Sequence, residues 1–139
     1  MKPILVRRED PLWSRSMGYE LRVVRESPLA FAELAKAIAP AGFELRDSEE
    51  IVTGHRGGVH AVARWQGQLV GEPGSDWQVA QLLRLSTALG GRLVGEDGEE
   101  YLLNEGVIEV SAAGGIAAGT VAIGKFEEII DAGPAAWSP

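Results

Sequence analysis

The chain has 139 residues, of which 45% are hydrophobic, and it contains no cysteine. A single domain of this length buries about 68% of its unfolded surface, and the absence of cysteine excludes disulfides, thiolate metal sites and thiol nucleophiles. The net charge of −7 is uneven, because residues 1–69 carry 10 basic and 9 acidic side chains, whereas residues 70–139 carry 3 basic and 11 acidic ones. The negative half repels phosphate backbones and attracts basic proteins, so we expect a protein partner with a basic surface and no nucleic acid.

The apolar stretches of the sequence do not indicate a secreted or membrane-spanning protein. The short apolar stretch at residues 4–6 is interrupted at once by Arg7 and Arg8, which argues against a secretory signal. The longest uncharged run, residues 110–124, is 15 residues long and is broken by glycines, whereas a membrane-spanning helix needs about 20 mainly apolar residues. We therefore expect a cytoplasmic protein that does not bind membranes.

The first strand and the first helix are predicted from alternation and from helix-start signals. Residues 19–25 alternate between apolar and polar sides, as a half-buried strand does. Ser27 and Pro28 then start a helix, because serine caps free amides and proline lacks an amide that a helix start leaves unpaired. This helix is predicted to run to residue 39 and to end at Pro40 and Gly42. Its predicted core face consists of Phe31, Leu34, Ala35 and Ile38.

The next part of the chain reads as a series of strands. Residues 43–46 are extended, and an acidic loop separates them from a strand at residues 51–52. A glycine-rich loop at residues 54–58 precedes a strand at residues 59–65. Its predicted buried face consists of Val59, Ala61, Ala63 and Trp65, and its other face of His60, Val62, Arg64 and Gln66. A turn at Gln66 and Gly67 leads into a short strand at residues 68–70.

Residues 75–103 contain the clearest local signals in the chain. Ser75 and Gln78 have the spacing of a capping box, in which each side chain bonds to the backbone amide of the other residue. Helical spacing places an apolar stripe on one face of the helix, formed by Val79, Leu82, Leu83, Leu85 and Leu89. Gly90 and Gly91 end the helix, and Asp97-Gly98 predicts a hairpin with a two-residue type I′ turn.

These elements predict an α+β fold in which two helices pack on one face of a mainly antiparallel sheet. The predicted order is β-α-β-β-α-β, followed by additional C-terminal strands at residues 107–111 and 119–123 and a short helical turn at residues 126–130. We expect one domain over residues 1–139. Two prolines place residues 1–16 in an N-terminal arm or at a sheet edge, and residues 132–139 are expected to form a frayed tail in which Trp137 docks.

An acidic cluster surrounds the predicted hairpin turn and consists of Glu96, Asp97, Glu99 and Glu100. It lacks the spacing of a calcium loop, so we predict no metal site here. No second acid at a defined separation indicates a paired-carboxylate hydrolase. We predict no catalytic residues and no cofactor. The cluster is expected to be a solvated turn or a contact surface for a basic partner.

His55, Arg56 and His60 surround the glycine-rich loop and support an alternative hypothesis. Histidine is the most common general base, and a glycine-rich loop can approach an anion closely, so this loop could serve a small enzyme or a ligand-binding domain. No nucleophile or orienting acid is identifiable nearby. His60 shares its predicted strand face with Arg64, which favours exposure to solvent.

Trp77 and Arg84 lie opposite the leucine stripe of the predicted helix. A tryptophan on a polar face is either covered by another segment, such as the C-terminal tail, or exposed as an anchor for a partner. Both alternatives remain open from the sequence. Trp77 and Arg84 therefore join the four hairpin carboxylates as candidate interaction residues.

Two segments resemble a family of small bacterial proteins. They are Met17-Gly18-Tyr19-Glu20-Leu21 and the run from Leu89 and Gly90 through Gly95-Glu96-Asp97-Gly98-Glu99 to Tyr101. Members carry M-[SG]-Y-[DE]-L near their start and L-G-[AG]-x-x-x-G-[DE]-D-G-E-x-Y later in the chain. The resemblance covers about residues 17–103, implies a shared fold and implies no activity. Some such proteins are similar to immunity proteins of bacterial toxin systems, which are small, acidic and cytoplasmic.

The leading hypothesis is a non-enzymatic cytoplasmic protein that binds a basic protein partner through its acidic half and resembles an immunity protein. The alternative is the enzyme or ligand loop at His55, Arg56 and His60. A homodimer built through the free sheet edges is a third possibility that the sequence leaves open.

Overall fold

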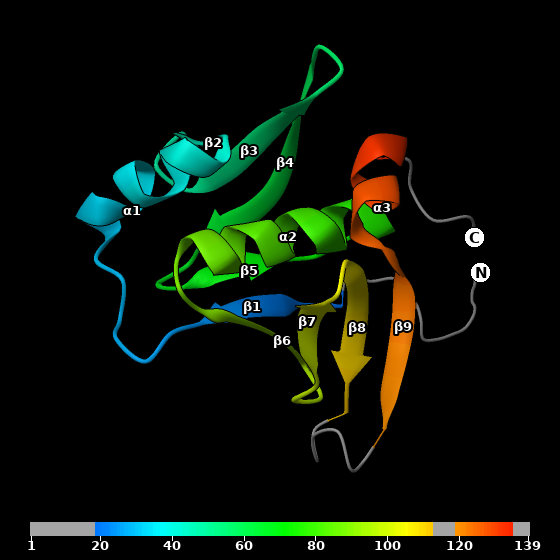
Figure 1. Cartoon of the computed structure of the whole chain (residues 1–139). Helices are drawn as coiled ribbons and strands as arrows, with labels where there is room; N and C mark the ends of the chain where they lie inside the picture. Colours follow the sequence, from blue (N-terminus) through cyan, green and yellow to red (C-terminus); the bar gives the residue numbers. More distant parts are fainter. Residues whose placement is uncertain (1–18, 113–118, 135–139) are drawn as a thin grey trace, which may run out of the picture.

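The computed structural model describes residues 19–112 and 119–134. Three parts of the chain lie outside these residues: the predicted N-terminal arm, Trp137, and residues 113–118 of the uncharged run at residues 110–124. Within them, nine strands form one sheet in the order β2-β3-β4-β5-β1-β6-β7-β8-β9, and every neighbouring pair is antiparallel (Figure 1). The coarse prediction of an α+β fold with a mainly antiparallel sheet is confirmed.

The order of elements differs from the predicted one, because four strands separate the first two helices. The strands are β1 (Leu21–Val24), β2 (Phe43–Arg46), β3 (Glu50–His55), β4 (Gly58–Trp65), β5 (Leu69–Gly71), β6 (Arg92–Gly95), β7 (Glu100–Asn104), β8 (Val107–Ser111) and β9 (Thr120–Lys125). The helices are α1 (Phe31–Ile38), the short 3₁₀ helix η1 (Ala39–Ala41), α2 (Asp76–Ala88) and α3 (Phe126–Ala132). The third helix exceeds the short turn that the sequence predicted.

The first strand of the described chain lies in the middle of the sheet. In β1, Leu21 and Val23 are buried, in agreement with the predicted alternation. Leu21 lies opposite Gly71 of β5 on one side and Gly95 of β6 on the other. The connection from β5 to β6 runs through α2, which crosses the sheet over β1 (Figure 1). The core therefore depends on strands that are distant in the sequence.

The start of α2 is confirmed, with one difference in the capping box. The amide of Gln78 donates to Ser75 Oγ at 3.3 Å. The Gln78 side chain, however, accepts from the amide of Gly74 and not from that of Ser75, and its nitrogen donates to the carbonyl of Ala61 at 3.3 Å. The glutamine thus ties the helix start to β4 as well as capping it.

The apolar stripe of α2 is buried throughout, and the helix ends just before Gly90 and Gly91, as predicted. Val79, Leu82, Leu83, Leu85 and Leu89 are all buried. Gly90 has a φ of +70°, a left-handed conformation in which a Cβ atom would be strained. In the middle of the helix the contact with β5 is close, since a Cβ on Gly71 would come within 2.7 Å of Leu82.

The first helix begins later than predicted. The residue before α1 is Ala30, and neither Ser27 nor Pro28 belongs to the helix. Leu34 and Ile38 are buried as predicted, whereas Phe31 is 40% exposed and Ala35 is exposed. Phe31 is the first residue of the helix, and its ring lies beside that of Trp65, with the ring centroids 5.8 Å apart. The predicted end is confirmed by Gly42, which has a φ of +92°.

The predicted buried and exposed faces of β4 are wrong for the residues that precede a β-bulge. The register with β3 shifts between Ile51 and Val52, so the side-chain alternation changes phase at this point. As a result His60 points toward the core, and Val59 is 53% exposed. Ala63 and Trp65, which follow the bulge, keep the predicted inward side.

The β6–β7 hairpin forms where predicted but has a different turn. Gly95 and Glu99 close a three-residue loop through a 2.9 Å hydrogen bond between the Gly95 amide and the Glu99 carbonyl. A type I′ turn requires positive φ at both central residues, and Asp97 does not have it, whereas Gly98 has a φ of +81°. Among the described residues, consecutive pairs with positive φ occur at Asp47-Ser48, Arg56-Gly57 and Glu105-Gly106, in the β2–β3, β3–β4 and β7–β8 turns.

Candidate functional site

The acidic hairpin carboxylates are largely bonded within the protein. The hydroxyl of Tyr19 donates to Glu99 Oε2, and the hydroxyl of Tyr101 donates to the same oxygen at 3.3 Å. The amide of Asp97 donates to Glu99 Oε1 at 3.1 Å. Glu99 therefore joins two tyrosines that belong to separate parts of the chain, and we call these three residues the Tyr-Glu-Tyr cluster.

The cluster changes the acid–base behaviour of both tyrosines. Burial, together with the hydrogen bond to the Glu99 carboxylate, raises the pKa of Tyr19 well above its usual value. Burial and the nearby Glu99 charge raise the pKa of Tyr101 in the same way. Both hydroxyls consequently stay protonated as donors, which a carboxylate acceptor requires.

The other predicted hairpin carboxylates also have partners. Glu96 accepts from the amide of Glu20 at 2.6 Å, and Glu100 lies 3.4 Å from the guanidinium of Arg92. These contacts bring together the two sequence segments that carry the family resemblance. The hairpin turn is thus bonded to the residues that precede β1, and its carboxylates are not simply a solvated turn.

Trp77 is covered by the protein itself. Its side chain is 1% exposed, and the rings of His55 and His60 meet it edge-on at centroid distances of 5.8 and 5.5 Å. A Cβ on Gly133 would come within 2.6 Å of His55 Nε2, so the end of α3 closes this packing. Trp77 is therefore not available as a surface anchor.

The His55–His60 loop is used for packing. Arg56 donates to the carbonyl of Asp131 in α3 at 2.9 Å and lies 3.4 Å from its carboxylate. His55 Nε2 and Trp77 Nε1 are buried and have no hydrogen-bond partner among the described residues. The loop holds α3 in place, and the groove described below is lined by none of its three candidate residues.

Arg84 is part of the tertiary structure as well. Its guanidinium donates to the carbonyl of Ala41 and to Gln81 Oε1, and it lies 5.0 Å above the ring of Phe43. These contacts join α2 to η1 and β2. Arg84 is thus a bridging residue whose charge is already engaged.

A groove that the sequence did not predict lies between α2, η1, β7 and α3. Its volume is about 290 Å³, and it is lined by Ala41, Leu83, Arg84, Thr87, Ala88, Leu103 and Phe126. Leu103 is 50% exposed although it lies on the strand face that packs the core, opposite the buried Ile108. The sequence offered no local signal for this groove, because its residues come from four separate elements.

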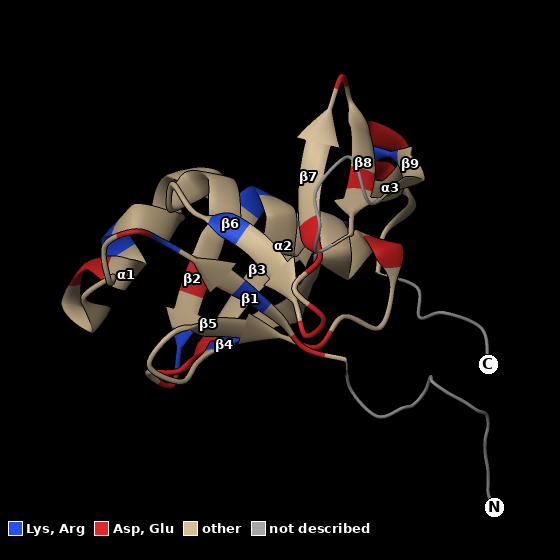
Figure 2. Ribbon diagram, turned by 90° about the horizontal axis from the view of Figure 1, so that it is seen from below, with Lys and Arg blue, Asp and Glu red and all other residues tan. Residues whose placement is uncertain are grey.

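Exposed acidic residues follow Phe126, which lines this groove, in the chain. The amide of Phe126 donates to the carbonyl of Gly106 at 2.8 Å, so α3 begins beside the β7–β8 turn. Glu105 precedes Gly106 and Glu127 follows Phe126 in the chain, and Figure 2 shows acidic residues on both the β7–β8 turn and α3. Glu105, Glu127 and Glu128 are all exposed. We call the apolar lining together with these three carboxylates the C-terminal groove. Lys125 lies 3.9 Å from Glu128 and is the basic residue nearest in the chain.

In the described residues, no group of three or more histidine, cysteine, aspartate or glutamate side chains is arranged to hold a metal ion. None of the described helices is long and apolar enough to cross a membrane. Comparisons with protein-family models, with curated proteins and with solved structures find no match to the chain.

Proposed function

We propose that the protein is a non-enzymatic protein-binding domain whose C-terminal groove receives a basic, partly apolar segment of a partner protein. The observation that carries this proposal is the 50% exposure of Leu103 in a mainly apolar groove, whose lining residue Phe126 is followed in α3 by the exposed Glu127 and Glu128. An apolar centre with a polar rim is the usual composition of a protein interface. Contiguous exposed apolar surface marks interaction sites more often than isolated apolar residues do.

The charges favour a basic partner. Glu105 and Glu127 have no ion-pair partner among the described residues, and Glu128 has only the long contact with Lys125. Such exposed charges accelerate encounter with an oppositely charged surface and disfavour acidic partners. The hairpin carboxylates are less suited to this role, since Glu99 and Glu96 already accept internal hydrogen bonds.

The resemblance to small acidic bacterial proteins supports one class of partner. An immunity protein neutralises a toxin by covering it, and acidic immunity proteins suit toxins with basic active surfaces. The proposal therefore includes a cytoplasmic toxin as the partner. This role requires a groove and charges on the surface and no catalytic group in the protein itself.

The test is a quantitative affinity purification from the native host with the unmodified protein and with a charge-reversed variant, Glu105→Lys, Glu127→Lys and Glu128→Lys. We expect a partner with a basic surface that is retained by the unmodified protein and lost by this variant. A second variant, Leu103→Ser, removes the exposed apolar side chain without changing charge and should weaken the same complex.

The matched control reverses three exposed carboxylates outside the groove, Glu26→Lys, Glu33→Lys and Glu49→Lys. It changes the net charge by the same amount, so retention of the partner by the control separates a local contact from overall charge. Equal retention by all variants would refute the proposal. A doubled solution mass that returns to that of a monomer in the groove variant would instead assign the groove to a second copy of the chain.

A further inference from the structure

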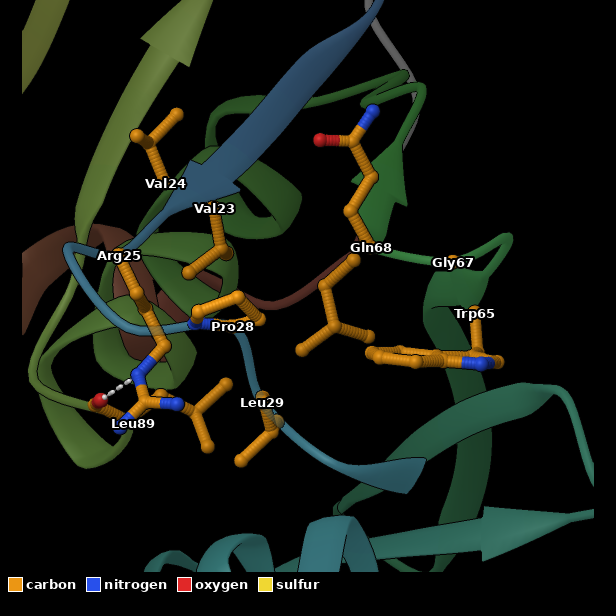
Figure 3. A pocket seen from close by; sticks show the side chains of 10 residues that line it. Val23, Val24, Arg25, Pro28, Leu29, Trp65, Gly67, Gln68 and Leu89 are labelled. Atoms are coloured by element: carbon orange, nitrogen blue, oxygen red, sulfur yellow. Dashed lines mark hydrogen bonds between the residues drawn. The ribbon is translucent and has the colours of Figure 1, made fainter.

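A second hollow, which shares no residue with the C-terminal groove, lies at the end of β1 where the chain leaves the sheet. Its volume is about 240 Å³ (Figure 3). The lining residues are Val23, Val24, Arg25, Pro28, Leu29, Trp65, Gly67, Gln68, Leu69 and Leu89. They come from β1, the segment before α1, the β4–β5 hairpin and the end of α2. We call this hollow the Arg25 pocket.

Most of the residues that line the Arg25 pocket are apolar, although polar atoms form a comparable part of its exposed surface. Val23, Leu69 and Leu89 belong to the buried core. The indole ring of Trp65 is half-buried and lies across the pocket from Arg25 (Figure 3). A ligand that enters would lie along an aromatic plane, which favours a flat apolar group.

Arg25 is held in position at the edge of the pocket by the end of α2. Its Nε donates to the carbonyl of Leu89, the residue that ends α2, at 2.7 Å. Within the described residues, no carboxylate forms an ion pair with Arg25. The terminal guanidinium nitrogens remain as donors, and a guanidinium matches a planar carboxylate with two parallel hydrogen bonds. The half-buried cation is therefore suited to an anionic group on a ligand.

The remaining chemistry narrows the class of ligand. Gln68 also lines the pocket, but its exposed side-chain amide points away from Trp65 and Leu29 (Figure 3). A volume of about 240 Å³ is below the usual range for drug-sized ligands. A phosphate or dicarboxylate would bring a second negative charge, and Arg25 is the only cation among the described residues that line the pocket. A single carboxylate needs only one cation.

We infer that the Arg25 pocket binds a small aromatic or aliphatic monocarboxylate, with its carboxylate on Arg25 and its apolar part between Trp65 and the core leucines. This binding activity is separate from the proposed protein interface. It places a ligand at the junction of the central strand and the end of α2, and none of the residues that line the pocket belongs to the His55–His60 loop.

The test compares phenylacetate with its uncharged amide, phenylacetamide, by NMR titration of the full-length protein. We expect phenylacetate to shift the amide signals of Val24, Leu69 and Leu89 and the indole signal of Trp65. Phenylacetamide should bind at least about tenfold more weakly, because it cannot form the charged pair. Hexanoate tests whether an aliphatic chain replaces the aromatic ring.

Variants localise the site. Arg25→Gln should reduce phenylacetate affinity at least about tenfold. Arg22→Gln is the control: it makes the same charge change three residues earlier, on the opposite face of β1, and should leave the affinity unchanged. Trp65→Leu should weaken binding without altering Arg25. If Arg25→Gln does not fold, the comparison of phenylacetate with phenylacetamide on the unmodified protein still tests whether the carboxylate is recognised. Equal binding of acid and amide, or shifts outside the pocket, would overturn the inference.

Discussion

The hydroxyl of Tyr101 donates a hydrogen bond of 3.3 Å to the carboxylate of Glu99, two residues before it in the chain. Tyr19, which precedes Glu99 by 80 residues, donates to the same carboxylate oxygen. The acidic β6–β7 hairpin is thereby fastened to the entry of the central strand. The acidic cluster that the sequence places at the hairpin turn is therefore in part a tertiary contact.

Removing either hydroxyl of the Tyr-Glu-Tyr cluster should destabilise the protein. Tyr19→Phe and Tyr101→Phe should each lower the free energy of unfolding by about 0.5–1.5 kcal/mol, measured by urea denaturation. The double variant should lose more than the sum of the two, because Glu99 then keeps only the amide of Asp97. Strict additivity would show that the two hydroxyls do not share one acceptor.

A matched pair of carboxylate variants tests the same contact from the acid side. Glu99→Gln should cost more stability than Glu100→Gln. Glu100 has only a 3.4 Å contact with the exposed Arg92, and surface pairs of this kind contribute about 0–1 kcal/mol.

The tyrosines also predict a loss of stability in alkali. Tyrosine is neutral below its pKa and charged above it, and the pKa of both Tyr19 and Tyr101 is raised above the ordinary value of 10.0. Their contribution is therefore fully present below about pH 10 and is lost as the pH rises beyond that value. Urea denaturation at a series of pH values should show this decline. The double phenylalanine variant should show a flatter profile, and an unchanged slope would contradict the assignment.

Gly133 should be sensitive to substitution by alanine. Its φ is +92°, and a Cβ there would come within 2.6 Å of His55 Nε2. Gly133→Ala should therefore cost about 1–3 kcal/mol and loosen α3, because strain and overpacking act together. Tryptophan fluorescence should shift to longer wavelength as Trp77 becomes exposed.

Gly57→Ala is the control for Gly133, since Gly57 has a φ of +85° with no atom within 4 Å of a built Cβ. It carries the backbone strain without the clash, so its effect should be smaller. Equal effects of the two variants would mean that contact with His55 contributes nothing.

Arg84 should contribute to stability through its bridge from α2 to η1. Arg84→Met keeps the length of the side chain and removes the hydrogen bonds to Ala41 and Gln81, so it should cost about 1.5–3 kcal/mol. Arg84→Lys should recover little, because lysine lacks the planar fork and stacks less well on Phe43. Arg92→Met, at an exposed position, should change the free energy of unfolding by less than about 0.5 kcal/mol.

The sequence by itself determined the local parts of the protein. The α2 helix, from its Ser75 cap to the left-handed Gly90, follows from hydrogen bonds and conformational preferences that act within a few residues. The alternation of β1 and the position of the β6–β7 hairpin are local in the same sense. The order of strands was not predicted, since β1 pairs with β5 and β6, which follow it by more than 40 residues.

Only the tertiary structure decided what the candidate residues contact. A β-bulge turned His60 inward, and the third helix brought Gly133 over His55, so Trp77 became buried on the face that its helix spacing had marked as polar. The C-terminal groove and the Arg25 pocket each combine residues from several elements. Local patterns depend on neighbours in the chain, whereas these surfaces depend on which distant segments pack together, and that packing is determined by the fold as a whole.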